Sequence, residues 1–414
     1  MKHRRLRIVT ALLVSSSLIA AACGDDDDAT AADDLTEQGE TSTTEGTEGE
    51  ATDAEAPSGD PIKIMTIMRV TAANQSTTEE AAEVVELAAE AQNERGGLLG
   101  RPVEVIVCDE GGDANKAAEC ARQAVDEGVV AVVGSATAQG DAINPILEQA
   151  GIPAIGVFPT AASDMMTSTS FPLGGSPAWI AGCTRILAAE GATKIAVVHF
   201  DLPAGAFASD FAKQGLSGTD AEIESTVPVP IEAVDYNPLV SQAADNADGI
   251  MMVLQPEMAG RWLVASAQQG VDIPQCAPGL SNEVIESVGE QAEGIFVSNS
   301  YAPVASGGPG IDRFVKEVGE DLADDFFTPN AWLAFQLFVG AVEAAEPADV
   351  TAETVLAAMQ AADGVDLEDV VPPYSTQTPG PGPLAALYNP TYFPSVVEDG
   401  KIVAIGDAVN AFTG

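Results

Sequence analysis

From residue 62 onward, short apolar runs alternate with longer segments in which apolar residues recur every three or four positions. The short runs predict β-strands and the longer segments predict amphipathic helices. In the first part of the pattern, strands are expected at residues 62–68, 103–108, 129–133 and 153–157. Helices are expected at residues 77–94, 114–126 and 142–150, and Asp113 is placed as the N-cap of the second of these helices.

The alternation restarts after a break at residues 171–176. Near-continuous apolar strands that alternate with helices predict parallel sheets covered on both faces, so two such runs indicate an α/β chain with two doubly wound lobes. The C-terminal third holds too few strands for a sheet of its own. We expect its elements to complete the two lobes, and its Asp399-Gly400 pair predicts a hairpin turn within residues 396–405. The further helices are expected at 178–190, 207–216, 237–245, 257–269, 311–322, 330–345 and 352–362, and the further strands at 194–200, 223–229, 249–254 and 295–299.

The first 22 residues have the pattern of a signal peptide. Four basic residues within the first seven precede an apolar stretch that is too short to span a bilayer comfortably. The segment Ala20-Ala21-Ala22-Cys23 resembles a bacterial lipobox, with Ala20 where Leu is usual, so Cys23 is expected to carry the lipid anchor. An ordinary secretory signal followed by an incidental cysteine is the alternative.

Residues 23–60 are predicted to form an acidic, disordered tether. Positions 24–60 hold fourteen acidic residues, no Lys or Arg, and one large apolar residue, Leu35. Such a composition cannot bury enough apolar surface to offset the entropy of the chain. The segment is therefore interpreted as a spacer between a membrane and the globular part of the chain.

Charge excludes further classes of function. The 414 residues contain 63 acidic and 17 basic side chains, a net charge of −46. This charge repels phosphate backbones and anionic lipid headgroups, so the partners are expected to include no nucleic acid. No nucleotide-binding, metalloprotease or nucleophile-elbow motif is present, and no cofactor is implied. His199 lies inside a predicted strand and is interpreted as structural, so the chain is not expected to be an enzyme.

Four cysteines beyond Cys23 suit an oxidising compartment. They are Cys108, Cys120, Cys183 and Cys276, an even set that allows three pairings. Cys108 ends a predicted strand and Cys120 lies in the next helix, which favours a local bridge. Cys183 would then pair with Cys276. No two of the four have a C-x-x-C spacing, so a metal site is not predicted.

Several segments resemble type I periplasmic binding proteins of the branched-chain amino acid class. The first is Asn93-Glu94-Arg95-Gly96-Gly97-Leu98-Leu99-Gly100-Arg101-Pro102-Val103, which continues to Cys108-Asp109. Val133-Gly134, Gly151-Ile152-Pro153-Ala154-Ile155 and Val234-Asp235-Tyr236-Asn237-Pro238 follow in order, so the resemblance covers about residues 61–414. In the first segment, Gly96 and Gly97 can supply the left-handed backbone that ends a helix.

The resemblance implies an extracytoplasmic solute-binding lipoprotein of an ABC importer, monomeric, that closes two lobes on a small ligand and docks on permease subunits. It also implies a three-strand hinge with crossings near Gly174, Ser300 and Thr376. The lobes would then be residues 61–174 with 301–375, and 175–300 with 376–414. A surface sensor that reports a ligand to a receptor is the alternative function.

Ligand-binding residues follow from the resemblance position by position. The loop after the third strand is Ser135-Ala136-Thr137-Ala138-Gln139, where Thr137 or Ala138 would hold a ligand carboxylate. Thr160 and Phe158 lie in the loop after the fourth strand, and hydroxyl or N–H donors there suit a carboxylate. Turn and N-cap chemistry is the alternative role for the two threonines.

The second lobe departs from the amino-acid-binding pattern. Ala204 and Gln255 stand where family members have tyrosines, and residues 275–280 lack the Glu that pairs with the ligand ammonium. Glu257 and Glu283 lie near in sequence but do not align. We therefore expect either another acid or a ligand that is not a standard α-amino acid, such as a carboxylate or an amide. Tyr301, beside the second crossing, is a candidate cleft or hinge aromatic.

Overall fold

The computed structural model describes residues 56–71, 77–201, 205, 207–380, 382 and 384–413. The predicted signal peptide, the lipidation site Cys23 and nearly all of the predicted tether lie outside the described residues. Among the described residues, no helix has both the length and the apolar character needed to cross a membrane.

The first sheet has five parallel strands in the order β2-β1-β3-β4-β5. Strand β1 is buried on both faces, as its near-continuous apolar run predicts: Ile64 and Met68 join one core cluster, and Met65 and Ile67 join another. The edge strand β2 is mostly half-buried. Helices α1 and α13 pack together and α13 contacts β3 and β4, whereas α2 and α3 pack together and α2 contacts β1 and β2. The strands are β1 (Ile62–Met68), β2 (Val103–Asp109), β3 (Ala131–Val133), β4 (Ala154–Ile155) and β5 (Ser170–Phe171), and the helices are α1 (Glu79–Glu94), α2 (Ala114–Asp126), α3 (Gly140–Ala150) and α13 (Thr328–Ala345).

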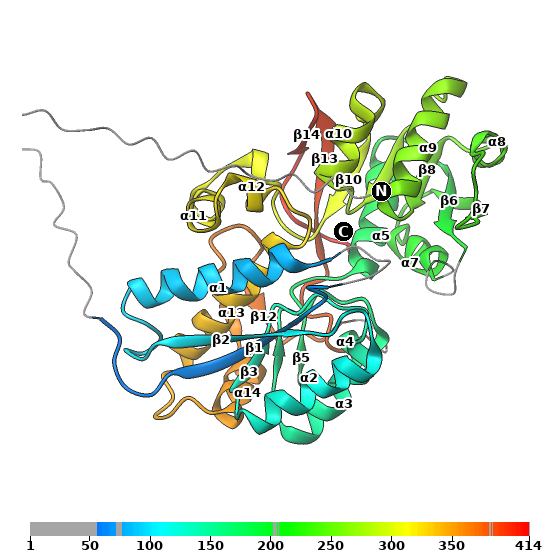
Figure 1. Ribbon diagram of the computed structural model, residues 1–414. Helices are drawn as coiled ribbons and strands as arrows, with labels where there is room; N and C mark the ends of the chain where they lie inside the picture. The colour runs from blue at the N-terminus through cyan, green and yellow to red at the C-terminus, as the bar shows by residue number, and fades with distance from the viewer. Residues whose placement is uncertain are drawn as a thin grey trace, which may run out of the picture. The chain divides into compact units, whose positions relative to one another are not determined.

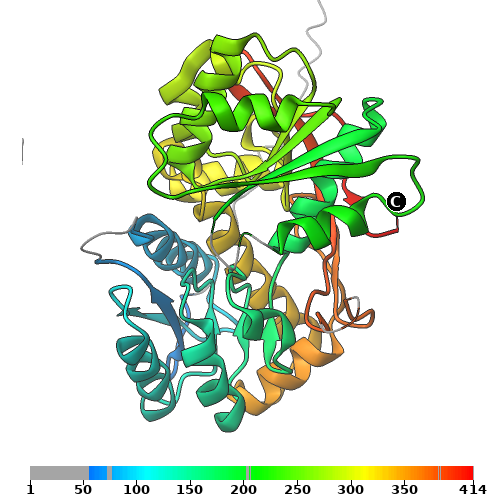
Figure 2. The same ribbon diagram turned by 90° about the vertical axis from the view of Figure 1, so that its right-hand side faces the viewer.

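The second sheet has the order β14-β13-β10-β9-β8-β6-β7, and one short strand, β15, pairs with β13 off this path. Strands β6 to β10 are parallel, but β13 and β14 run antiparallel at one edge, so this sheet is mixed. Figure 2 shows helices on both sides of it. Its elements are α5 (Ser176–Ala189), β6 (Lys194–Phe200), α7 (Ala208–Gly215), β7 (Glu222–Val229), α8 (Asn237–Ala244), β8 (Gly249–Val253), α9 (Pro256–Gln269), β9 (Gln275–Pro278), α10 (Asn282–Val288), β10 (Phe296–Asn299), β13 (Thr391–Glu398), β14 (Lys401–Ala404) and β15 (Val409–Asn410).

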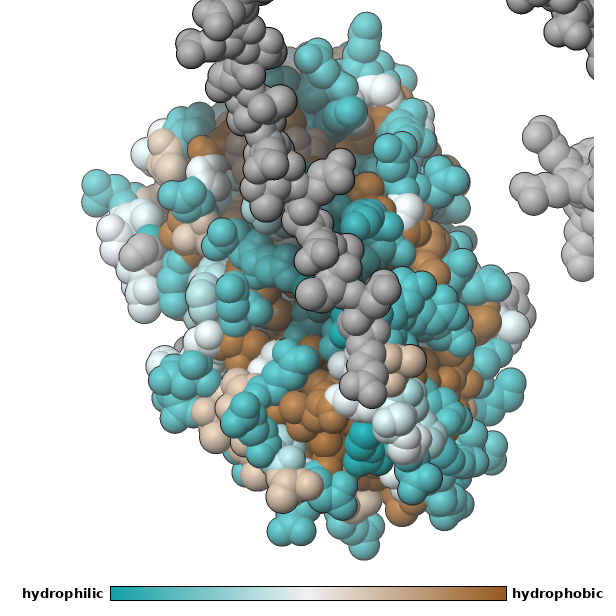
Figure 3. All heavy atoms as spheres, turned by 90° about the vertical axis from the view of Figure 1, so that its left-hand side faces the viewer, coloured by the Kyte–Doolittle hydropathy of each residue, from teal (hydrophilic) through white to brown (hydrophobic). Residues whose placement is uncertain are grey.

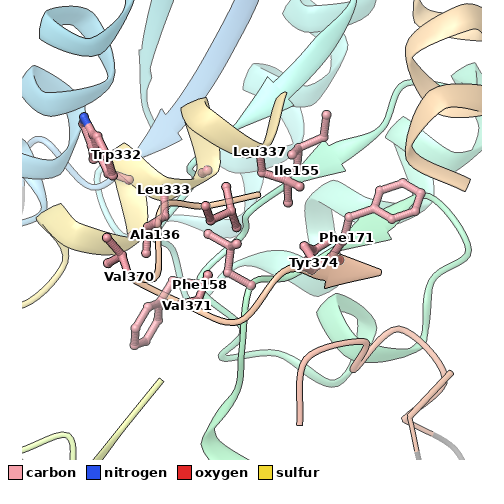
Figure 4. Close-up of a cluster of buried hydrophobic side chains, with 14 of the residues drawn as sticks. Ala136, Ile155, Phe158, Phe171, Trp332, Leu333, Leu337, Val370, Val371 and Tyr374 are labelled. Carbon is pink, nitrogen blue, oxygen red and sulfur yellow. The ribbon is translucent and has the colours of Figure 1, made fainter. Parts of the chain in front are cut away.

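The C-terminal third is shared between the two sheets, as expected (Figure 1). Helix α13 lies with the first sheet, and Figure 4 shows its Leu333 and Leu337 in one buried cluster with Ile155 of β4 and Phe171 of β5. Strand β13 pairs with β10 of the second sheet. The remaining elements are α4 (Ala162–Met166), α11 (Pro309–Val318), α12 (Glu320–Ala323), α14 (Ala352–Ala361), β11 (Asp363–Val365), β12 (Tyr374–Ser375) and the short 3₁₀ helices η1 (Gly289–Ala292) and η2 (Val304–Ser306).

The turn between α1 and β2 has the predicted backbone. Gly96 and Gly97 have φ of 106° and 77°, and a Cβ on Gly97 would lie 2.2 Å from the Arg101 carbonyl oxygen. The side chain of Asn93 then joins the helix end to the strand, because its Nδ2 donates to the Val103 carbonyl at 2.9 Å and its Oδ1 accepts from Val103 N at 2.8 Å. The motif therefore fixes where β2 begins beside β1.

Both disulfides favoured by the sequence are present. Cys108–Cys120 joins the end of β2 to α2, and Cys183–Cys276 joins α5 to β9. The first closes a span of 12 positions and the second a span of 93. The longer bridge therefore ties together parts of the second sheet layer that are distant in sequence.

Two of the predicted crossings lie side by side. A Cβ on Gly174 would lie 2.2 Å from Ser300 Oγ, and Trp179 Nε1 of α5 donates to the same hydroxyl. At the third predicted crossing, Thr376 N donates to the Ala362 carbonyl at 3.0 Å. Farther along the chain, Asn389 Nδ2 donates to the Leu173 carbonyl at 2.8 Å just before β13 begins. The lobe limits stay a prediction.

Several elements differ from those predicted. Strand β5 forms at the start of the expected break, and β9 and α10 occupy a stretch for which no element was predicted. The single helix expected at 311–322 is divided into α11 and α12 at Gly319, whose φ is 89°. The predicted hairpin exists, with Asp399 and Gly400 at φ of 51° and 73°, but its first strand begins earlier, at Thr391.

The surface is mainly hydrophilic on the face that Figure 3 presents. Figure 3 shows one face on which hydrophilic side chains predominate and hydrophobic ones are scattered among them. The apolar side chains are instead concentrated in the clusters that cover the faces of the two sheets.

Candidate functional site

Both sheets have the winding order that creates a binding crevice at strand ends. The order β2-β1-β3 reverses direction between β1 and β3, and the order β7-β6-β8 reverses in the same way between β6 and β8. Ligands of doubly wound sheets bind outside the carboxyl ends of the strands at such switch points. The loops that follow β1 and β3, and those that follow β6 and β8, are therefore the segments to inspect, together with the neighbouring loops after β4 and β9.

The loop after β3 is fixed by hydrogen bonds that its hydroxyls accept and donate. Ser135 Oγ accepts from Ile67 N at 3.0 Å, and the Ser135 carbonyl accepts from Phe158 N at 2.9 Å. Thr137 Oγ1 donates to Glu110 Oε1 at 2.8 Å and accepts from Gln139 N at 3.1 Å. The Thr137 hydroxyl is therefore engaged within the protein, which matches the alternative role that the sequence left open.

Thr160 contacts the same loop. Its Oγ1 donates to the Thr137 carbonyl at 2.8 Å, so the structure brings these two predicted residues together. Ala138 lies between Thr137 and the first turn of α3 and is exposed, and no hydrogen bond is assigned to its backbone N–H within the described part of the chain. Gln139 is the N-cap of α3 and is partly buried. The donors that remain at this edge are thus main-chain N–H groups at the start of α3.

Two carboxylates at the carboxyl end of β2 hold the neighbouring loops. Glu110 is completely buried, and Thr137 is the partner of its Oε1. Asp109 accepts from Thr71 N and from Gly111 N, each at 3.0 Å. Burial acts to raise the pKa of Asp109, but the hydrogen bonds from Thr71 and Gly111 outweigh it and lower the pKa below its ordinary value. These acids therefore position loops of their own chain.

A third buried carboxylate, Asp164 of α4, shapes the loop after β4. Its Oδ2 accepts from Thr160 N at 3.1 Å and from Ala161 N at 2.8 Å, and its Oδ1 accepts from Asn144 Nδ2 at 2.8 Å. Burial raises the pKa of the Asp164 carboxyl, although the donors of Ala161, Asn144 and Thr160 oppose the shift. Asp164 therefore fixes the backbone that carries Thr160.

Four aromatic rings meet where elements of the two sheets come together, and we call them the aromatic cluster. Phe158 follows β4, Trp179 lies in α5, and Phe326 and Phe327 precede α13. The ring of Phe158 lies 5.4 Å from that of Trp179, 5.7 Å from that of Phe326 and 5.1 Å from that of Phe327. Gly279, after β9, lies against the cluster, because a Cβ there would be 3.2 Å from Phe326 and 3.3 Å from Trp179.

Tyr301 supports this cluster from the second predicted crossing. Its hydroxyl donates to the Phe326 carbonyl at 2.8 Å, and burial raises the pKa of the phenol well above its ordinary value. Tyr301 and Phe326 also line a cavity of about 250 Å³, together with Leu280, Asn299 and Asp325. Tyr301 is thus a positioning side chain that stays protonated at neutral pH.

The second-sheet residues are the least connected part of the predicted site. Gln255 is the N-cap of α9, where it is exposed and makes no side-chain cap. Ala204 lies outside the described residues. The structure therefore brings Thr137 and Thr160 together in one loop region. It also joins Phe158 to Tyr301 through Phe326. Among the described residues, Gln255 contacts neither group.

Sequence reasoning missed Glu110, Asp164, Trp179, Phe326 and Phe327 as residues of this site. Trp179 is 8% exposed, and it packs on Phe158 and Phe326 at the proposed crossing. A signal for the phenylalanines existed in the Phe326-Phe327 pair directly before a predicted helix. Nothing in the sequence indicated that this pair would meet Phe158.

Comparison with known proteins places this geometry in a family. Residues 61–385 match the family model described as periplasmic binding protein. The structure of a putative branched-chain amino acid ABC transporter from Rhodospirillum rubrum is similar, with a TM-score of 0.68 at 21% sequence identity. The alignment covers 83% of this chain and 100% of the Rhodospirillum rubrum chain. No curated protein sequence matched the chain.

Other solved structures show the same fold with different ligands. A branched-chain amino acid ABC transporter from Thermus thermophilus with bound valine has a TM-score of 0.69 at 16% identity, covering 85% of this chain and 97% of its own. A solute-binding protein of an ABC transporter from R. palustris in complex with benzoate has a TM-score of 0.66 at 20% identity, covering 84% and 98%. On the evidence of the family match across residues 61–385 and of this fold, the chain belongs to the periplasmic binding proteins, a family of extracytoplasmic solute-binding proteins.

Proposed function

We propose that this protein is the solute-binding component of an ABC importer and that it captures a small organic molecule at the carboxyl ends of its two sheets. The observation that carries the proposal is the aromatic cluster, in which rings attached to elements of both sheets meet beside the loops after β3 and β4. Small-molecule sites are typically apolar surfaces with a few convergent polar groups. The proposed ligand contacts are Thr137, Ala138, Gln139, Phe158, Thr160, Gln255 and Tyr301.

Closure of two lobes is the proposed mechanism of capture. Lobe I comprises residues 61–174 and 301–375, and lobe II comprises residues 175–300 and 376–414. The contacts among Gly174, Trp179 and Ser300 support this division, because they connect two of the proposed crossings at one place. A ligand that contacts both lobes stabilises the closed state, which docks on the permease as a monomer.

Lipid attachment at Cys23 is proposed to hold the protein at the membrane, with residues 24–60 as the spacer. The sequence pattern before Cys23 supports it. A Cys23→Ser variant expressed in a Gram-positive host should leave the membrane fraction and appear in the medium, whereas the wild type should stay with the membrane. Equal membrane retention of both forms would contradict the lipid anchor.

A thermal-shift screen tests the binding function. Amino acids, amides, short carboxylates and aromatic acids are added separately to the mature protein, since a ligand that binds only the folded state stabilises it by about 2.7 kcal/mol at one hundred times its Kd. At least one class should raise the unfolding midpoint. Absence of any shift across all classes, or steady turnover of a compound, would contradict a solute-binding role.

Variants then test the location of the site. Thr160→Ala removes the hydroxyl that bonds to the Thr137 carbonyl, and Gln255→Ala removes an exposed amide at the second sheet. At least one of them should weaken the binding found in the screen by several-fold, whereas Lys213→Gln on α7 should not. Normal binding by both variants would mean that the ligand binds elsewhere.

A further inference from the structure

One cavity of the molecule contains a buried polar side chain to which no described residue is hydrogen-bonded. It is the cavity of about 250 Å³ that Tyr301 and Phe326 line, and its walls come from α10, the end of β10, the start of β14 and the segment between α12 and α13. Two polar residues of its wall are already engaged, because Ser281 Oγ accepts from the backbone of α10 and Asn282 Nδ2 donates to the segment before α13. Pockets for small molecules typically measure about 300–1,000 Å³, so this cavity suits a small head group.

The unpaired side chain is that of Asn299, the last residue of β10. Asn299 is only 8% exposed, and its amide has no hydrogen bond with any described residue. The other buried asparagines of the described chain, Asn144, Asn330 and Asn389, each donate through Nδ2 to an acceptor at 2.8 Å. Buried amides are normally paired. The Asn299 amide therefore lacks a partner that a group inside the cavity can supply.

The position of Asn299 in the sheet explains why its side chain lines this cavity. Successive side chains of a strand point to opposite faces. Val297, two residues earlier, is buried in the cluster that contains Val284 and Ile285 of α10. Asn299 lies on the same face, at the carboxyl end of β10, where ligands of doubly wound sheets bind. The amide is therefore at the edge where the proposed function places a ligand.

Three groups of the cavity determine which hydrogen bonds a ligand can make there. The Tyr301 hydroxyl gives its proton to the Phe326 carbonyl, so its oxygen can only accept a further hydrogen bond. Asp325, whose Oδ1 accepts from Phe327 N at 2.8 Å, also supplies acceptor oxygens. The Asn299 amide supplies both donors and an acceptor. The matching ligand group therefore has at least two N–H or O–H donors and one acceptor.

Charge weighs against an anionic group in this cavity. Its charged lining residues are three acids, Glu286, Asp324 and Asp325, and one base, Lys401. Glu286, Asp324 and Lys401 are exposed, and exposed charges contribute little to binding because water screens them. The partly buried Asp325 is thus the charge that bears most on a bound group. It repels a carboxylate and attracts an N–H donor.

From this inventory we infer that the cavity receives a carboxamide or urea group of the ligand. The inference rests on the proposed binding function and specifies its substrate class. The carbonyl oxygen of that group accepts from Asn299 Nδ2, and its N–H groups donate to Asn299 Oδ1 and to the oxygens of Tyr301 or Asp325. The rest of the ligand lies against Phe326, which joins the cavity to the aromatic cluster. A carboxylate lacks the donors and an amine lacks the acceptor, so neither completes these hydrogen bonds.

Compounds of similar size that differ only in their head group test the substrate class. Calorimetric titration of the mature protein compares benzamide, benzoate and benzamidine, and a second set compares 3-methylbutanamide, 3-methylbutanoate and 3-methylbutylamine. In at least one set the amide should bind about tenfold tighter or more than the other two, a difference of about 1.4 kcal/mol. Tighter binding of the acid would overturn the inference in favour of an anion held by Lys401. Tighter binding of the amidine or the amine would overturn it in favour of a cation held by Asp325.

Two asparagine variants test the cavity itself. Asn299→Leu keeps the approximate size of the side chain and removes the amide, so it should weaken binding of the amide at least tenfold. Its thermal midpoint without ligand should not fall, because no hydrogen bond to a described residue is lost. Asn330→Leu is the matched control for stability, and its midpoint should fall because the Gly156 carbonyl loses its donor. A comparable fall in Asn299→Leu would mean that Asn299 has a structural role and would overturn the inference.

The remaining outcomes separate the two levels of the proposal. Wild-type affinity of Asn299→Leu for the amide would overturn the cavity as the binding site of that group. Hits of another chemistry in the broad screen, without binding of either amide, would overturn the substrate class and leave the binding function standing. A screen without hits in any class would overturn both.

Discussion

Replacing the buried Asp164 tests how the loop after β4 is held. The Asp164→Ala variant leaves three donors without their acceptor: Thr160 N, Ala161 N and Asn144 Nδ2. Each unpaired buried donor costs about 1–3 kcal/mol. Removal of a buried carboxylate relieves part of this cost, and the exposed Thr160 can reach water, so the net loss of unfolding free energy should be about 3–5 kcal/mol.

The assay is urea unfolding of the mature protein, followed by far-UV circular dichroism. The midpoint should fall and the slope should stay unchanged if the variant alters stability without altering the unfolded state. Asp113→Ala is the matched control, because Asp113 is an exposed cap whose side chain accepts from Asn115 N and Lys116 N. It should lose about 1 kcal/mol. A loss for Asp164→Ala no greater than that of the control would refute the reasoning.

Two further predictions concern the same part of the chain and its disulfides. Burial raises the pKa of Asp164, so above the unfolded pKa of 3.8 the folded state binds more protons than the unfolded state. The unfolding free energy of the wild type should therefore rise relative to that of Asp164→Asn as the pH falls from 7 toward 4. The opposite trend in urea titrations would contradict this. Replacing the Cys183–Cys276 pair by alanines should lower the unfolding free energy by up to about 4.7 kcal/mol, against about 3 kcal/mol for Cys108–Cys120, because the longer span constrains the unfolded chain more. A lower urea midpoint for the variant without Cys108–Cys120 would contradict this.

The fold was predictable wherever a long apolar pattern ended at a clear signal. Strand β6 and helix α2 have the predicted bounds, since β6 is a continuous apolar run and α2 begins after Asp113, whose side chain caps it. Strand β5 has only two residues and could not produce a periodic pattern. Strand β9 contains the buried polar Gln275, which is acceptable there because its side chain is hydrogen-bonded: Oε1 accepts from Trp262 Nε1 at 3.1 Å, and Nε2 donates to Ser266 Oγ at 2.9 Å.

The candidate site was predictable only in part, because its contacts join distant segments. Sequence position identified the loops with Thr137 and Thr160, but their hydroxyls donate inside the protein, to Glu110 and to the Thr137 carbonyl. Those partners are set by how β2, β3 and β4 lie in the sheet. Likewise Phe158 and Phe326 are far apart in sequence, and they meet only because α13 packs against the first sheet.

The central claim is that a small ligand binds at the carboxyl ends of both sheets. Hydrogen–deuterium exchange, measured with and without a compound that raises the unfolding midpoint, tests it most directly, because bound segments open less often. We predict slower exchange in residues 134–139 and 156–161 of the first sheet and in residues 277–281 of the second, all in one experiment. Protection confined to the groove that Glu257, Arg261 and Glu283 line beside α9, or to a single sheet, would contradict the account.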